Sequence, residues 1–274
     1  MNHYKETLRL GAPIMLGQLG IIIVGFADNI MVGHHSVQEL AAASFVNNFF
    51  NLAFICGMGF SYGLTPIVGR LYSQKQEDEI GGVLKNSLFL NGAVGVLLSL
   101  CMLFLLFRID WLGQPEELYP YIYPYYTLQL FSVIFTMLFN SFKQFSDGTT
   151  DTFTPMCIML GANVLNIIGN YLLIYGHAGF PEMGLTGAGI STLLSRVLTL
   201  LVFAALFVSR QKYAAYLKGF RKAVLNKADI SKLVRLGIPV GFQMGVESAS
   251  FSLSVIMMGW IGSSALAAYQ IGIV

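Results

Sequence analysis

Long runs of apolar residues, separated by short polar segments, extend through most of the chain. A helix needs about 20 apolar residues to cross the roughly 30 Å hydrocarbon core of a bilayer. The runs are unbroken and lack the ten-residue alternation of transmembrane barrel strands, so the pattern predicts an all-α, polytopic membrane protein. The predicted spans are residues 12–33, 40–67, 82–107, 119–142, 155–176, 185–208 and 236–259, and an eighth is expected to begin before Val274.

Composition agrees with this pattern, because 55% of the residues are hydrophobic and only 11% are charged, whereas soluble proteins have about 25% charged residues. The basic residues fall mainly on one side of the predicted bilayer. The N-terminus and the segments after the second, fourth and sixth spans hold 14 of the 16 Lys and Arg. The positive-inside rule therefore predicts a cytoplasmic N-terminus. The basic segment 210–235 is interpreted as a topological determinant and not as a nucleic-acid contact. No removable signal peptide is expected.

The beginning of the chain recurs near its end. Residues 9–13, RLGAP, return as residues 235–239, RLGIP, 226 positions later. At the same offset Met31 and Gly33 recur as Met257 and Gly259, and residues 40–42 recur as Leu266, Ala267 and Ala268. One unit therefore fills about 226 residues, and a complete pair would have about 450 residues.

Each unit holds six spans, an even number, so the two units begin on the same side of the membrane. They are parallel repeats, related by an axis along the membrane normal. The predicted organisation is two parallel six-helix bundles, with twelve helices when complete. Residues 1–208 form the N-terminal lobe, 209–231 a cytoplasmic basic linker and 232–274 the truncated start of the C-terminal lobe.

Three ionisable residues lie well inside the predicted spans: Asp28, Arg196 and Glu247. An ionised side chain at the bilayer centre costs about 2.5 to 3.5 kcal/mol, so such residues usually face a cavity or a partner. Asp28 shares a helix face with Gly17 and Gly25, and burial disfavours the charged form of a carboxyl group. Asp28 is therefore a candidate carrier of a proton or cation, with an interfacial position as the alternative. For Arg196, snorkelling, interhelical pairing and substrate contact all remain open.

Two polar stripes follow helical spacing. Asn163, Asn166 and Asn170 lie on one face of the fifth span. Their amides suit cation coordination and interhelical hydrogen bonding equally. On the seventh span Gln243, Glu247, Ser250 and Ser254 follow at steps of 4, 3 and 4. A shorter patch on the second span is interpreted as a cavity rim: Ser44, Asn47, Asn48 and Asn51.

No combination of residues resembles an enzyme site. The chain has no phosphate-binding motif of an ATP-driven pump, so any transport is expected to use an ion gradient. His34, His35 and His177 are interpreted as solvated loop residues, and the three cysteines match no metal-binding spacing. No metal site is predicted.

Several ordered motifs resemble the multidrug and toxic compound extrusion (MATE) family over essentially the whole chain. The motifs are Arg9-Leu10-Gly11-x-Pro13, Ala27-Asp28-Asn29-Ile30-Met31-Val32-Gly33, Leu40-Ala41-Ala42, Asn166-x3-Asn170-Tyr171, Ile174-Tyr175-Gly176 and Gly237-x-Pro239-x7-Glu247-x3-Phe251. An acid in place of Asn170 marks the archaeal and DinF-like branch, so the chain is most similar to the NorM-like branch.

The resemblance implies two six-helix lobes around a central cavity and a secondary active antiporter. Such a protein exports cationic or amphipathic compounds in exchange for H⁺ or Na⁺, with no other cofactor. By position, the resemblance assigns cation coupling to Asp28, Asn166 and Asn170. Glu247 matches the family's seventh-helix acid. From the polar stripes, substrate binding is assigned to Glu247, Gln243, Asn163 and Ser250, and the seventh-span stripe is expected to face the cavity between the lobes.

The implied partners are small-molecule substrates and membrane lipid, with no nucleic acid, for a monomer in the bacterial cytoplasmic (inner) membrane. One alternative is a flippase for lipid-linked oligosaccharide or peptidoglycan precursors, which would need several cationic residues in its cavity. Here only Arg196 lies well inside a span. A membrane scaffold or receptor is a further alternative, but it does not explain the polar stripes.

Overall fold

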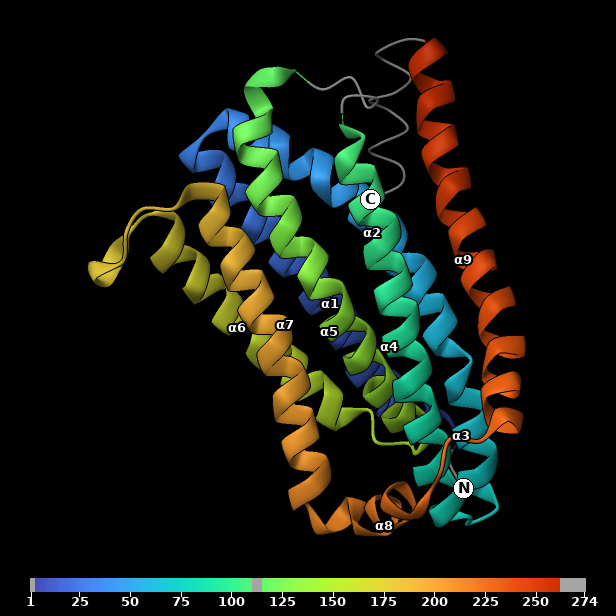
Figure 1. Ribbon diagram of the computed structural model, residues 1–274. Coiled ribbons are helices and arrows are strands. Elements are labelled where there is room, and N and C mark those ends of the chain that lie inside the picture. Colours follow the sequence, from blue (N-terminus) through green and yellow to red (C-terminus); the bar gives the residue numbers. More distant parts are fainter. Residues whose placement is uncertain (1–2, 110–114, 262–274) are drawn as a thin grey trace.

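The computed structural model describes residues 3–109 and 115–261, and all of the long elements in this part of the chain are helices. They pack into an elongated bundle (Figure 1). The main helices are α1 His3–His35, α2 Val37–Tyr62, α3 Leu64–Ser73, α4 Glu77–Phe107, α5 Tyr119–Gly148, α6 Phe153–Ile174, α7 Gly184–Ser209, α8 Ala214–Lys222 and α9 Lys227–Ile261. Single 3-10 turns lie at Glu116–Leu118, His177–Gly179 and Gln211–Tyr213.

Six segments of the described residues are long and apolar enough to cross a membrane, and they match the first six predicted spans. These are Thr7–His35, Val37–Ser73, Glu77–Phe107, Glu116–Gly148, Phe153–Ile174 and Gly184–Ser209. The seventh predicted range is helical, as part of α9. The second span is divided at Gly63 into α2 and α3. The predicted eighth span and the repeat at residues 266–268 lie outside the described residues.

Local sequence signals explain where the helices begin. Ser36 is extended and caps α2, because its side-chain oxygen accepts a hydrogen bond from the Glu39 amide at 3.5 Å. Pro120 lies in the first turn of α5, where its missing N–H has no intrahelical partner to lose. Gly176 and Gly184 adopt positive φ between α6 and α7, a conformation that glycine enters without steric cost.

The core has two halves. One is built mainly from α2 and α5, and it includes the buried residues Val46, Phe50 and Tyr126. The other lies toward α8 and is built from aromatic rings, with Phe142 and Phe203 stacked at a centroid distance of 5.0 Å.

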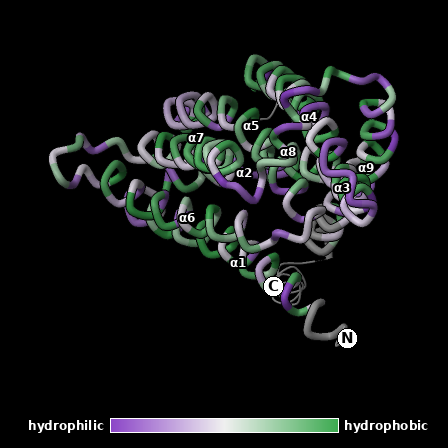
Figure 2. Tube along the Cα trace, turned by 90° about the horizontal axis from the view of Figure 1, so that it is seen from below, coloured by the Kyte–Doolittle hydropathy of each residue, from purple (hydrophilic) through white to green (hydrophobic). Residues whose placement is uncertain are grey.

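The predicted basic linker, 209–231, is largely helical. It contains α8, which lies across the end of the bundle in two perpendicular views (Figures 1 and 2). α8 packs against α4, where the backbones of Gly219 and Asp78 meet. α9 also begins inside the predicted linker, at Lys227.

The turn between α5 and α6 is tied to the start of α8 by Asp151. This carboxylate lies 2.7 Å from Lys212 Nζ and accepts a hydrogen bond from the Tyr213 hydroxyl at 2.5 Å. Burial works against the charged form of Asp151, but hydrogen bonds from Lys212, Tyr213 and Thr154 outweigh it and lower its pKa. Burial raises the pKa of Tyr213 to about 12, so its hydroxyl keeps its proton at neutral pH.

α9 docks on α2 through glycines. A Cβ atom on Gly59 would lie 2.8 Å from the Cα of Gly241, and one on Gly63 would lie 2.8 Å from the nitrogen of Gly237. Small residues allow two backbones to approach closely, the usual way that helices associate in lipid. The repeated motif at 235–239 therefore contributes Gly237 to an interhelical contact.

Candidate functional site

A cavity of about 710 Å³ opens within the bundle, with walls from α1, α2, α5, α6 and α7. Carboxylate, guanidinium, amide and hydroxyl groups alternate on its wall with apolar and aromatic side chains. Its polar residues are Asp28, Asn29, Ser44, Asn47, Asn48, Asn51, Tyr125, Gln129, Thr136, Asn163, Asn166, Thr192, Ser195, Arg196 and Thr199. Phe50, Phe54 and Phe139 are among its apolar residues.

Asp28 of α1 meets the asparagine stripe of α6 at this cavity. Asn170 Nδ2 donates to Asp28 Oδ1 at 2.5 Å. With the Asn166 amide turned so that both its ends are satisfied, its nitrogen lies 3.1 Å from the same oxygen and its oxygen accepts from Thr192. The structure thus brings together the three residues that the sequence assigned to cation coupling. Asn170 is fully buried, and its Oδ1 has no hydrogen-bond donor among the described residues.

Arg196 of α7 contacts α5 and α2. Its Nη1 donates to Gln129 Oε1 at 2.9 Å and also to Ser132 Oγ. Its guanidinium carbon lies 4.6 Å from the centre of the Phe54 ring, a cation–π distance. Of the three roles left open by the sequence, the structure shows interhelical contact together with a place on the cavity wall.

The hydrogen bonds continue from Arg196 toward α2. Gln129 Nε2 donates to the Tyr125 hydroxyl at 3.0 Å, and Tyr125 donates to Asn47 Oδ1 at 3.0 Å. Sequence reasoning identified Asn47 as part of the α2 rim but did not identify Tyr125 or Gln129. The available signal was spacing, since Tyr125, Gln129, Ser132 and Thr136 follow at steps of 4, 3 and 4 along one helix face.

The other predicted site residues divide into two groups. Asn163 lines the cavity, and its Nδ2 is buried with no hydrogen-bond partner among the described residues. All four residues of the predicted rim on α2 also line it. Gln243, Glu247 and Ser250 lie exposed on α9 and are not part of the wall of this cavity.

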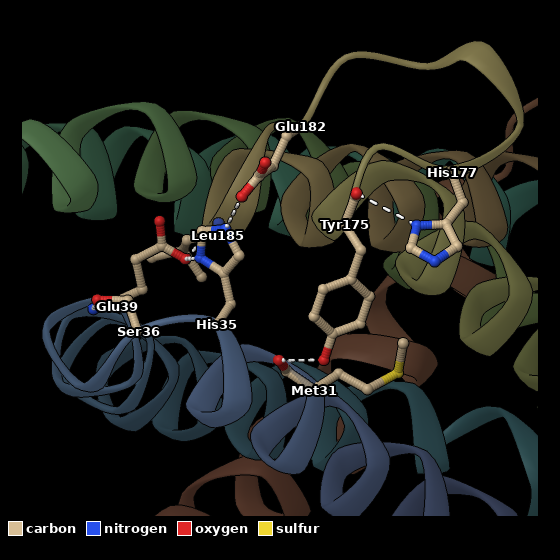
Figure 3. A network of polar contacts seen from close by, with 8 residues as sticks. All are labelled: Met31, His35, Ser36, Glu39, Tyr175, His177, Glu182 and Leu185. Atoms are coloured by element: carbon tan, nitrogen blue, oxygen red, sulfur yellow. Dashed lines mark hydrogen bonds and ion pairs between the residues drawn. The ribbon is translucent and has the colours of Figure 1, made fainter.

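A second polar cluster lies at the ends of α1 and α6 (Figure 3). His35 Nδ1 is 2.8 Å from Glu39 Oε2, and its Nε2 is 2.9 Å from Glu182 Oε1. Glu39 is buried and also accepts the Leu185 N–H at 2.9 Å. The prediction of a solvated histidine is therefore wrong for His35, whose side chain is only 19% exposed. Glu39 is four residues along the chain from His35, whereas Glu182 is 147 positions away and is brought close by the fold.

The described wall of the cavity carries one carboxylate, from Asp28, and one guanidinium, from Arg196, among amide, hydroxyl and aromatic groups. The carboxylate can attract a cationic group and the guanidinium an anionic one, and both attractions are stronger in a site shielded from water. The phenylalanine rings offer apolar and cation–π contact. Within residues 3–109 and 115–261, no three His, Cys, Asp or Glu side chains are grouped so that they could hold a metal ion.

Comparisons with known proteins agree with this architecture. The model of the MatE family matches residues 13–172. A probable multidrug resistance protein NorM from Photorhabdus laumondii is 31% identical over 97% of this chain and 58% of its own length. The multidrug resistance protein NorM of Photobacterium profundum is 26% identical over 99% of this chain and 60% of its own.

Solved structures show the same fold. The MATE transporter VcmN of Vibrio cholerae superposes with a TM-score of 0.84 at 19% identity, over 98% of this chain and 60% of that one. The chain thus spans about three fifths of the length of the proteins that it resembles.

Proposed function

Since the chain belongs to the MatE family, we propose that the protein containing it is a secondary active multidrug efflux antiporter. It exports cationic or amphipathic compounds in exchange for H⁺ or Na⁺ across the bacterial inner membrane, with its N-terminus in the cytoplasm. The observation that carries this proposal is the Asp28 carboxylate on the cavity wall, hydrogen-bonded to Asn170. A carboxylate that can bind a cation in one conformation and release it in another couples the ion to a conformational equilibrium.

The neighbours of Asp28 suit both of its protonation states. An amide has donors and an acceptor, so Asn170 can donate to the carboxylate through Nδ2 and accept from a protonated Asp28 through its free Oδ1. The carboxylate oxygens of Asp28 and the Oδ1 atom of Asn170 are also ligands of the kind that a hard cation such as Na⁺ prefers. Cation coupling is therefore assigned to Asp28, Asn166 and Asn170.

Substrate contact is assigned to the cavity wall at Asn163 and to the polar face of α9. Asn163 offers an unpaired amide to a ligand. Gln243, Glu247 and Ser250 present a carboxylate and polar groups on an exposed face of α9, which can attract a cation from outside this cavity.

The test is transport by the purified full-length protein in sealed vesicles. Efflux of a fluorescent cationic dye is followed with an imposed pH gradient, an imposed Na⁺ gradient, or neither. We expect efflux only with a gradient of the coupling ion, and without ATP. Equal dye movement with and without gradients would contradict the antiporter proposal.

A further inference from the structure

A second cavity, of about 370 Å³, lies at the corner where α7 turns into α8. It is separate from the central cavity and shares none of its lining residues. Apolar Val208 borders it on the α7 side, and the chain changes from apolar to basic within two residues, at Arg210. This change marks the level at which α7 leaves an apolar environment.

The α8 side of the corner is basic. Lys218, Arg221 and Lys222 are three and four residues apart, so they share one exposed face of α8 and line the cavity with Arg210. The other side of α8 holds the buried residues Tyr216 and Gly219, and Gly219 lies against α4. The three cations of α8 therefore project away from the bundle, and Arg210 before α8 is exposed as well.

These four side chains form no ion pair with any carboxylate in the described part of the chain, whereas neighbouring Lys212 pairs with Asp151. Like charges crowded into one corner repel each other, and a bound anion would remove that repulsion. The corner is thus complementary to a compact anionic group such as a phosphate.

An apolar stripe leads along α7 to this corner. Leu194, Leu198, Leu201, Ala205 and Val208 follow at steps of 4, 3, 4 and 3, and all five are exposed. Figure 1 shows α7 running directly into the turn that begins α8. The stripe ends at the cavity, because Val208 belongs to both.

We propose that this corner binds a phospholipid with an anionic headgroup, its phosphate among Arg210, Lys218, Arg221 and Lys222 and its acyl chains along the α7 stripe. Basic side chains next to a membrane span attract anionic lipids, and an amphipathic basic helix lies at the level of the headgroups. A phospholipid is the occupant, and not free phosphate, because acyl chains can cover the apolar stripe whereas free phosphate cannot. The site does not depend on the proposed transport activity.

The test measures lipid binding to the purified full-length protein by native mass spectrometry. The probes are phosphatidylglycerol, phosphatidylcholine and soluble glycerol 3-phosphate. One variant combines Lys218→Gln, Arg221→Gln and Lys222→Gln. Its matched control removes three exposed cations from other parts of the same side, with Arg70→Gln, Lys75→Gln and Lys227→Gln. A third variant keeps every charge, with Lys218→Arg, Arg221→Lys and Lys222→Arg.

We expect the wild-type protein to prefer phosphatidylglycerol over both other probes. The first variant should lose about a hundredfold in affinity, since each basic side chain near an anionic surface contributes a factor of about five. The control and the charge-retaining variant should bind as the wild type does. Equal losses in the first variant and the control, no loss in the first, or equal affinity for glycerol 3-phosphate would each overturn the proposal.

Discussion

Asn170 donates the shortest hydrogen bond that Asp28 accepts, at 2.5 Å, and it does so from a fully buried position. Replacing Asn170 with Ala removes that donor and leaves the Asp28 carboxylate less well satisfied. A lost hydrogen bond to a charged group costs about 1.5 to 3 kcal/mol. We expect Asn170→Ala to lower thermal stability in detergent by an amount in this range and to slow gradient-driven efflux.

Asn163 supplies the matched control for this prediction. It lies two turns before Asn170 on the same helix face, but its Nδ2 has no partner among the described residues. Asn163→Ala should therefore cause no loss of thermal stability, because it removes a buried amide nitrogen that has no hydrogen bond to lose. Equal destabilisation by the two variants would show that the bond to Asp28 is not what Asn170 contributes.

Glu39 and Glu182 contact the same imidazole but differ in burial. Glu39 is 6% exposed and accepts the Leu185 N–H at the start of α7, whereas the Glu182 side chain is 67% exposed. Glu39→Gln should destabilise the protein by about 1 to 3 kcal/mol, and Glu182→Gln by less than about 1 kcal/mol. Thermal unfolding of the two variants side by side is the measurement. The reverse order would contradict this account of the cluster.

The helix pair α2 and α9 depends on close backbone contact at Gly63. A methyl group there would lie 2.8 Å from the nitrogen of Gly237, so Gly63→Ala should push the helices apart and lower the unfolding temperature. Gly161 on α6 is the control, because a Cβ atom there would have nothing within 4 Å. Gly161→Ala should be neutral or stabilise by up to about 1 kcal/mol. Identical behaviour of the two variants would exclude the proposed contact.

Asp151 joins the turn after α5 to the segment before α8. Because its pKa is lowered in the folded protein, its contribution to stability is fully present above its ordinary pKa of about 3.9 and is lost as the pH falls through the folded value. Asp151→Asn should therefore lower the unfolding temperature at pH 7, with a smaller difference from wild type below pH 4. Asp229→Asn, which affects an exposed pair with Lys232 at 3.4 Å, should have little effect at either pH. A difference for Asp151→Asn that is independent of pH would contradict this assignment.

At the scale of the whole molecule, hydropathy predicted the helical spans well because the length of a span is fixed by the bilayer. It did not predict α8, since a helix of nine residues is too short to show the same signal. Spacing placed Asn166 and Asn170 on one face, and resemblance related them to Asp28. No local pattern could reveal the bond between Arg196 and Gln129, 67 positions apart, or the contact between His35 and Glu182, 147 positions apart. Such contacts depend on how the helices pack.

The most direct test of the central claim is gradient-driven dye efflux by the Asp28→Asn variant of the full-length protein in vesicles. The amide resembles the protonated acid in shape but cannot exchange a proton or balance a cation. Glu182→Gln is the matched control, because it makes the same chemical change at an exposed side chain outside the central cavity. We predict that Asp28→Asn remains folded and binds dye, but that its efflux falls to the rate of protein-free vesicles, while Glu182→Gln transports at the wild-type rate. Efflux by Asp28→Asn at the wild-type rate, with the wild-type ion dependence, would contradict the account.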